Sequence, residues 1–358
     1  MGARTVAAPS AGVPDGYVQP GSLIDRLGLG AEIWARLGLN LDQRREDVLK
    51  ELVFLLVKPD AVAAGKGHAV FSALDAAGLR FLHLSTTYGA GEATFEELYK
   101  FNLTVRNEKN MVGAWWLNRR LYTLGPSVAV LAHLPQGPRG RSIDDLTELK
   151  GPSNPYLAKP GQLRRRLAGT NLALNLVHSS DDALSSAREF LLFESPAALE
   201  RAFDRLFAPA GPHYLSRADW SACLDVTGRG SVDLDAVRVL TRLKLRLLGT
   251  VRCETCAAAL ERHRFRYQEI LRGDEDVRTA WWTHREICDA ELVALRACPG
   301  APAHAEPALL LADYRAYDSE AARRLWAGLA RLGFHTTEWE QVVVDTTMFY
   351  AYQFPGAD

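Results

Sequence analysis

A histidine with polar neighbours lies at the end of an apolar run, where its ring could act as a nucleophile. Asn175 precedes His178 by three residues, and two serines and two aspartates follow it directly. Lys58 stands at the end of a second apolar run, LVFLLV. A neutral imidazole can attack phosphorus near neutral pH, and cationic and hydroxyl groups can hold the phosphates in place. Phosphoryl transfer through a protein histidine would need residues of these types.

The segments that must position these residues alternate between strand and helix patterns. We expect strands at 52–57, 79–89, 126–134 and 171–178, and helices at 65–77, 94–101, 110–124, 144–151 and 182–193. Such alternation indicates a sheet with helices packed against it. Periodicity alone does not decide whether the strands run parallel or antiparallel.

The same segments resemble the nucleoside diphosphate kinase family over about residues 50–200. The residues that carry the resemblance are Lys58-Pro59-Asp60 and the Asn175-Leu-Val-His178-Ser-Ser-Asp181 run, which is similar to the family's N-x-x-H-G-S-D. The resemblance implies an α/β (α+β) fold, in which a ferredoxin-like four-stranded antiparallel sheet is packed with helices. It also implies an enzyme that moves the γ-phosphate of an NTP to a nucleoside diphosphate or a related acceptor.

The resemblance implies roles for individual residues. His178 corresponds to the phosphorylated histidine, and Glu189, eleven residues later, corresponds to the glutamate that orients its ring. Lys58 and Arg164 correspond to the cations that contact the phosphates. The remaining positions place the nucleotide or the histidine, and they are Tyr99, Ser153, Asn175 and Ser180.

Several positions depart from the family pattern. Thr147 stands where the family has a second arginine, for which Arg139, Arg141 or Lys150 are possible substitutes. Phe101 replaces an acidic residue two positions after Tyr99. The run LKGPSNPYLAK, followed by QLRRRLAGT and NLVHSSD, resembles the divergent, multidomain branch of the family, many of whose members are poorly active. The alternative reading is therefore a weak or inactive nucleotide-binding or scaffolding protein whose C-terminal region recognises a partner.

The resemblance also implies cofactors and partners. Mg²⁺ would accompany ATP or another NTP, and the chain would form a homo-oligomer, as a dimer or a larger assembly. The formal net charge of −1 predicts no general attraction to nucleic acid or to a membrane surface. Neither a signal peptide nor an apolar run of about 18 residues is evident, so we expect no membrane span. Five cysteines in an uneven arrangement favour a reducing cytoplasm over a disulfide framework.

A second constellation of possible ligands lies in the C-terminal half. Cys253-x-x-Cys256 and His284-x-x-x-Cys288 could hold a structural Zn²⁺, with His263 or Cys298 as a replacement for one ligand. The alternative is that these are small apolar residues on helix faces.

Residues 213–250 resemble a helix–loop–helix whose loop, 225–236, has the outline of a degenerate EF-hand. Arg229 and Ala236 stand where calcium ligands belong, so little calcium affinity is expected.

Four regions are expected along the chain. An N-terminal arm and helical extension occupies 1–47, and the kinase-like domain occupies 48–208. A helical region follows at 209–300, and a small α/β unit with strands in 308–314 and 342–354 occupies 301–358.

Overall fold

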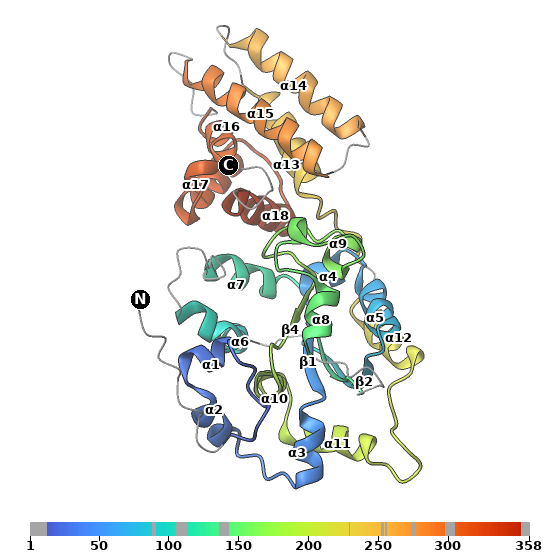
Figure 1. Cartoon of the computed structure of the whole chain (residues 1–358). Coiled ribbons are helices and arrows are strands. Elements are labelled where there is room, and N and C mark those ends of the chain that lie inside the picture. Colours follow the sequence, from blue (N-terminus) through green and yellow to red (C-terminus); the bar gives the residue numbers. More distant parts are fainter. Residues whose placement is uncertain are drawn as a thin grey trace. The chain divides into compact units, whose positions relative to one another are not determined.

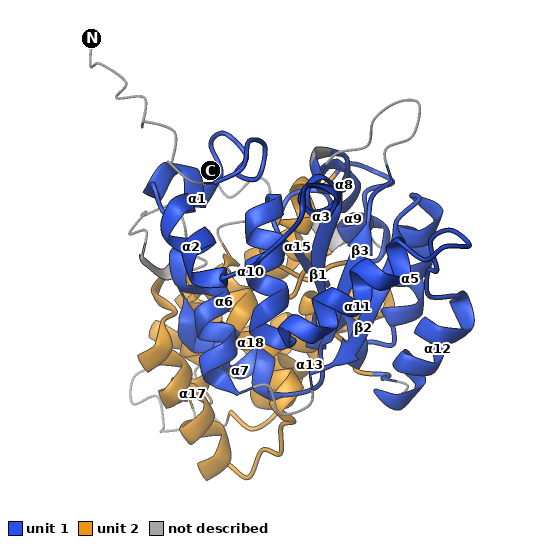
Figure 2. Cartoon of the chain, turned by 90° about the horizontal axis from the view of Figure 1, so that it is seen from below, with its two compact units in different colours: residues 1–152, 159–167, 176–231 blue, residues 153–158, 168–175, 232–358 orange. Residues whose placement is uncertain are grey.

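The computed structural model describes residues 13–87, 91–104, 114–135, 143–228, 230–251, 254, 256–273, 277–297 and 305–351 (Figure 1). The chain forms two compact units, which Figure 2 distinguishes by colour. The first comprises residues 1–152, 159–167 and 176–231, and the second comprises residues 153–158, 168–175 and 232–358.

A four-stranded sheet forms the centre of the first unit. Its strands β1 (Leu52–Val57), β2 (Arg80–Thr86), β3 (Val128–His133) and β4 (Val177–Ser179) are ordered β2-β3-β1-β4. Each neighbouring pair is antiparallel. The expected ferredoxin-like antiparallel sheet is therefore confirmed.

Helices cover both faces of this sheet, which explains why β1 reads as one continuous apolar run. Phe54 and Leu56 pack into a core with α10 and α11, whereas Val53 and Leu55 pack into another with α5 and α12. Successive strand side chains point to opposite faces, so a strand buried on both sides has no polar positions. The helices of this unit are α1 (Leu23–Leu27), α2 (Gly30–Leu37), α3 (Gln43–Leu49), α4 (Pro59–Ala63), α5 (Gly67–Ala76), α6 (Glu92–Thr104), α7 (Trp115–Thr123), α8 (Ile143–Lys150), α9 (Leu163–Arg166), α10 (Ala183–Phe193), α11 (Pro196–Leu206) and α12 (Arg217–Val226).

The N-terminal extension packs onto the core that contains α10. Tyr17 is fully buried, and its carbonyl accepts a hydrogen bond from the Leu184 amide at 2.9 Å. The Gln19 amide donates to the Asp182 carboxylate at 3.3 Å. The extension therefore contacts the helix that follows the histidine segment.

The predicted fourth strand was too long. Only Val177–Ser179 pairs with β1, whereas 171–176 is a folded loop. The Asn171 side-chain oxygen accepts the Ala173 and Leu174 amides at 3.0 Å each, and Leu176 has a φ of +77°. This turn and the left-handed residue prevent an extended strand before Val177.

The second unit is helical in its described residues, so the prediction of a small C-terminal α/β unit was wrong. The segment expected as strand 308–314 lies largely in α16, and most of 342–354 lies in α18; residues 352–354 are outside the described part. Thr337 begins α18 with a capping box, and Val342, Val343 and Val344 are buried in it. The stabilisation gained by burying these valines in a helix outweighs the preference of valine for strands. The helices are η2 (Pro155–Leu157), α13 (Ala236–Leu248), α14 (Ala257–Arg272), α15 (Val277–Arg296), α16 (Ala305–Ala312), η3 (Tyr314–Ala316), α17 (Ser319–Arg331) and α18 (Glu338–Phe349).

Candidate active site

His178, in β4, forms a hydrogen-bonded group with two residues that follow it. Its Nε2 lies 2.8 Å from Oε2 of Glu189 in α10, and the Ser180 hydroxyl donates to the same oxygen at 2.6 Å. A carboxylate at Nε2 favours the tautomer with the proton on that nitrogen, which leaves the Nδ1 lone pair available. One fifth of the His178 side chain is exposed, so the ring is accessible to a reactant.

Two tyrosines lie beside the histidine. The Tyr99 ring, from α6, meets the His178 ring edge-on with 5.7 Å between centroids. The Tyr99 and Tyr122 hydroxyls are 2.5 Å apart, and burial raises the pKa of both phenols. Both therefore stay neutral and can act as hydrogen-bond donors. Tyr122, in α7, was not anticipated, because nothing in its local sequence distinguishes it from other core positions.

Lys58 lies between β1 and α4 and is almost fully buried. Burial lowers its pKa to about 8, Asp60 opposes this shift, and Arg164 adds to it. The Lys58 ammonium also lies 5.9 Å from the centre of the Tyr122 ring. At neutral pH Lys58 thus remains mostly a cation that water screens poorly.

Asp60 connects the Lys58 segment to the residues before His178. Its Oδ2 accepts the Leu176 amide at 2.9 Å, and the Lys58 amide donates to the Leu176 carbonyl at 2.9 Å. Burial raises the pKa of Asp60. These bonds hold Leu176 in its left-handed conformation and so fix where β4 begins.

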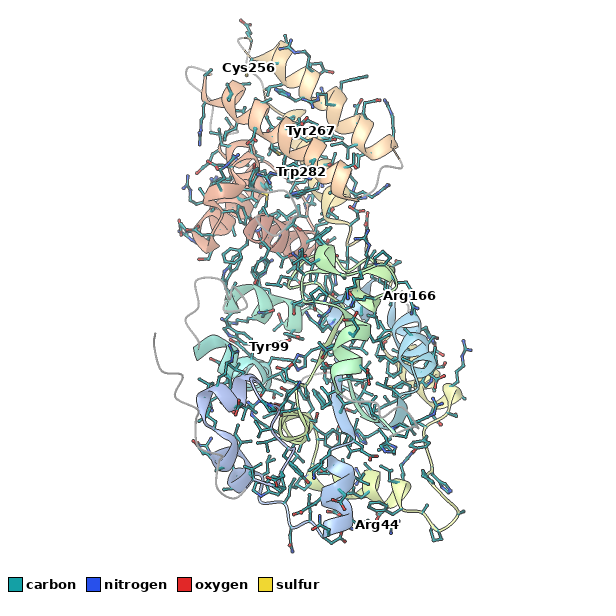
Figure 3. All side chains as sticks on the ribbon, in the orientation of Figure 1. Arg44, Tyr99, Arg166, Cys256, Tyr267 and Trp282 are labelled. Carbon is teal, nitrogen blue, oxygen red and sulfur yellow. The ribbon has the colours of Figure 1, made fainter. Side chains whose placement is uncertain are left out.

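The arginine triplet divides into one buried and two exposed members. Arg164 donates to the carbonyls of Gly151 (2.8 Å) and Val177 (2.7 Å), and burial lowers its pKa to about 10. Arg165 and Arg166, the next two residues, are exposed to solvent. Figure 3 labels Arg166.

Lys150 supplies a buried cation near the candidate site. Its ammonium donates to the Ser179 hydroxyl, and burial, followed by the nearby Arg164, lowers its pKa to about 7. Because strand side chains alternate, Ser179 and His178 point to opposite faces of the sheet. Thr147, where the family has an arginine, is exposed. Of the three suggested substitutes, Arg139 and Arg141 lie outside the described residues.

Ser153 and Asn175 belong to the second unit, where they lie together. The Asn175 amide nitrogen donates to the Ser153 carbonyl at 3.1 Å and to the Leu172 carbonyl at 2.8 Å. The Asn175 side chain thereby connects its own loop to Ser153, which lies 22 residues earlier in the sequence.

A small cavity of about 40 Å³ opens beside His178 and Glu189. Leu23 and Ile24 of the N-terminal extension line it on another side. Ligand pockets usually measure about 300 Å³ or more, so a nucleotide whose terminal phosphate reaches His178 would extend beyond this space.

The predicted zinc site is not supported. Cys253 lies outside the described residues, and within them no group of three or more His, Cys, Asp or Glu side chains could hold a metal. Cys288 contacts Tyr267 at 3.2 Å and His284 at 3.5 Å. Cys256 is eleven residues before Tyr267 on α14, a separation of about 16 Å along a helix, and Figure 3 shows the two at different levels of it. Cys256 therefore cannot share one ion with Cys288.

The EF-hand-like segment has two helices, α12 and α13, on either side of its loop. Its acidic residues have protein partners: Asp225 lies 3.7 Å from His68, and Asp233 accepts from Arg242 at 2.7 Å. Both carboxylates thus contact basic side chains of the protein.

Among the described helices, none is both long and apolar enough to cross a lipid bilayer.

Comparison with known proteins places these features in a family. The family model for nucleoside diphosphate kinase matches residues 51–198. The nucleoside diphosphate kinase of Symbiobacterium thermophilum is 30% identical over 163 residues, which cover 45% of this chain and 99% of that protein. That of Archaeoglobus fulgidus is 30% identical over 145 residues, covering 40% and 87%. Among solved structures, the nucleoside diphosphate kinase of Aquifex aeolicus is 22% identical with a TM-score of 0.35, over 41% of this chain and 97% of that one. The matched segment contains His178, Glu189, Lys58 and Arg164, and the chain belongs to the nucleoside diphosphate kinase family.

Proposed function

We propose that this protein is a phosphotransferase that uses His178 as a covalent relay. Nδ1 of His178 attacks the γ-phosphorus of an NTP, the bond to the bridging oxygen breaks, and a nucleoside diphosphate leaves. A terminal phosphate oxygen of a second nucleoside diphosphate, or of a related acceptor, then attacks the phosphohistidine and breaks the N–P bond. The observation that carries the proposal is the His178–Glu189–Ser180 group, because it leaves Nδ1 available on an accessible ring.

The surrounding residues would bind and position the phosphates. Lys58 and Arg164 would balance the negative charge that spreads over the phosphate oxygens during transfer. Tyr99, Ser153, Asn175 and Ser180 would place the nucleotide and the histidine ring. The pairing of Glu189 with Nε2 would stabilise the positive charge that develops on the imidazole.

Mg²⁺ fits this site as a companion of the nucleotide. The described residues offer no cluster of carboxylates that would hold the ion by itself, whereas Mg²⁺ commonly binds through phosphate oxygens and water. When bound to the nucleotide, it would neutralise phosphate charge. The cations Lys58 and Arg164 would then act on oxygens that the ion leaves free.

The test is incubation with γ-labelled ATP and Mg²⁺, comparing wild type with His178→Asn. His83→Asn is a matched control, since His83 lies 3.1 Å from the Glu194 carboxylate and is 19% exposed. We expect acid-labile, alkali-stable label on wild type and on His83→Asn, removed by added nucleoside diphosphate, and none on His178→Asn. Equal labelling of all three proteins, or of none, would overturn the proposal.

The second candidate is a domain that binds nucleotide without turnover. The exposed Thr147, at the position of a family arginine, favours it, because the site then has one phosphate-binding cation fewer. This reading predicts that ATP raises the melting temperature of wild type while no phosphohistidine forms. Label that a nucleoside diphosphate removes would exclude it.

We also propose that the chain forms a homo-oligomer in the cytoplasm and that its C-terminal region binds a protein partner. Family membership supports the first statement. The free thiols of Cys223 and Cys288 are consistent with a reducing compartment.

A further inference from the structure

Two short segments of the chain group with the C-terminal helices and not with the sheet. They are Ser153–Ala158 and Ala168–Asn175. Besides the bond from Asn175 to the Ser153 carbonyl, the Tyr156 hydroxyl donates to the Thr170 carbonyl at 2.8 Å. The Thr170 hydroxyl in turn donates to the Leu234 carbonyl at 2.8 Å, just before α13. The two segments are thus joined to each other and to the C-terminal half.

Asn171 fastens the second segment to α18. Its amide nitrogen donates to the hydroxyl oxygens of Thr346 (2.9 Å) and Thr347 (3.3 Å), and all three residues are buried. The Thr346 hydroxyl donates its own hydrogen to the Val342 carbonyl at 2.7 Å, which leaves its oxygen lone pairs for Asn171. Both hydrogens of the Asn171 amide and the hydroxyl hydrogen of Thr346 therefore have acceptors.

The amide oxygen of the Asn171 side chain stabilises the loop that ends at Asn175. Its oxygen accepts the amides of Ala173 and Leu174, and the Thr170 amide donates to the Leu174 carbonyl at 2.7 Å. One buried side chain therefore determines both the turn and its attachment to α18. Displacing Asn171 would displace Asn175 four residues later.

The helix that holds Asn171 is itself firmly placed. Asp345, next to Thr346 on α18, accepts from the Tyr317 hydroxyl at 2.6 Å and from the Trp326 indole nitrogen at 2.8 Å. Asp345 is fully buried, so these bonds lie in a low-dielectric interior where they are strong. The position of the loop thus depends on α17 and α18, and the contact from Asn171 to α18 spans 175 residues of the sequence.

We propose that α18 is a positioning element of the nucleotide site, with Asn171, Thr346 and Thr347 as positioning residues. The inference rests on the proposed function, in which Ser153 and Asn175 contact the nucleotide. The C-terminal helices would hold these two residues in the geometry that binds the NTP. The histidine group of the first unit would keep its intrinsic reactivity when this attachment is lost.

The test uses the full chain with Thr346→Val and Thr347→Val combined. Valine keeps the shape of threonine but removes both acceptors of the Asn171 amide. Thr241→Val is the matched control, because the Thr241 hydroxyl is fully buried in α13 of the same unit and has no hydrogen-bond partner among the described residues. The combined change Thr346→Ser and Thr347→Ser restores the hydroxyls and should restore function.

We expect the double valine variant to raise the KM for ATP at least about fivefold, as expected when a buried amide loses its partners, with kcat changed less than twofold. Labelling of His178 by phosphoramidate, a small phosphoryl donor without a nucleoside, should be unchanged. Thr241→Val and the double serine variant should match wild type in both assays. A loss of labelling by both donors would indicate general unfolding and overturn a positioning role.

The two proposals can fail separately. If wild type transfers phosphate and the double valine variant has an unchanged KM, the inference is wrong and the proposed function stands. If wild type shows no transfer, the proposed function is wrong, and ATP affinity measured by calorimetry decides the inference. Equal ATP affinity of wild type and the double valine variant, or no ATP binding by wild type, would then overturn it.

Discussion

At the scale of single residues, the candidate chemistry depends on a carboxylate that pairs with one nitrogen of an imidazole. Glu189 contacts Nε2 of His178 and also accepts from Ser180, so its position is fixed by two hydrogen bonds. A fixed carboxylate selects the ring tautomer and stabilises the charge that develops when Nδ1 reacts.

Replacing Glu189 with glutamine tests this pairing. Glu189→Gln keeps the shape but loses the charge, and we expect the rate of His178 phosphorylation to fall on the order of 10²-fold. Rapid-quench measurement with γ-labelled ATP gives that rate. Glu194→Gln, at the carboxylate beside His83, should leave it unchanged. A rate for Glu189→Gln within twofold of wild type would contradict the assigned role.

Lys150 predicts a dependence of stability on pH. Its pKa is about 7 in the folded chain, against 10.5 for an ordinary lysine, because burial disfavours the ammonium. Below pH 7 both folded and unfolded chains carry the charge, and the folded chain bears the full cost of burying it. Between pH 7 and 10.5 only the unfolded chain stays protonated, so the free energy of unfolding rises with pH in this window.

Lys150→Met removes the buried amine and keeps an unbranched side chain. We expect it to raise the free energy of unfolding most below pH 7, by a few kcal/mol at about 1.4 kcal/mol per pKa unit. The gain should shrink as the pH approaches 10.5. Denaturant unfolding at pH 6 and pH 9.5 measures it, with Lys159→Met as the exposed control. The same difference between variant and wild type at both pH values would refute this account.

At the scale of elements, the end of α4 and the segment before α13 approach closely. A Cβ added to Gly230 would lie 2.1 Å from the Ala63 carbonyl oxygen and 2.4 Å from that of Val62. These atoms belong to the backbone of the helix that follows Lys58, so they cannot turn aside as a flexible side chain would. Only glycine fits at this position.

Gly230→Ala should therefore destabilise the protein by about 1–3 kcal/mol, as expected when backbone must shift to admit an extra group. Gly228→Ala is the comparison, because its added Cβ meets nothing within 4 Å and only the φ of +83° costs energy. We expect a smaller loss there, of about 1 kcal/mol. Denaturant unfolding of both variants provides the measurement, and a larger loss for Gly228→Ala would disprove the close-approach argument.

At the scale of the whole molecule, the segment that matches the nucleoside diphosphate kinase family, residues 51–198, makes up less than half of the chain. We call it the family segment. Yet two pieces from within that region, 153–158 and 168–175, group with the helices of the second unit. The C-terminal half therefore contacts residues of the family segment directly. A positioning role for α18 requires this contact between the C-terminal helices and residues 168–175.

The sequence by itself was sufficient to predict the strands, the histidine segment and the family, and the resemblance to that family implied the antiparallel sheet. Each is encoded locally: β1 is an apolar run of strand length, Asp182 caps α10, and the spacing from His178 to Glu189 is read directly along the chain. Signals of this kind can be read from neighbouring residues in the sequence, without knowing which distant residues pack against them.

Only the tertiary structure decided which residues meet from distant parts of the chain. The Lys150–Ser179 and Tyr99–Tyr122 contacts join different elements, and the attachment of Asn171 to α18 spans 175 residues. Dependence on distant contacts also explains why strands were wrongly predicted in the C-terminal region. Every residue of 342–348 is buried, so the sequence shows no alternation of exposed and buried positions that would distinguish a strand from a helix. Packing against the rest of the second unit determines that this segment is a helix.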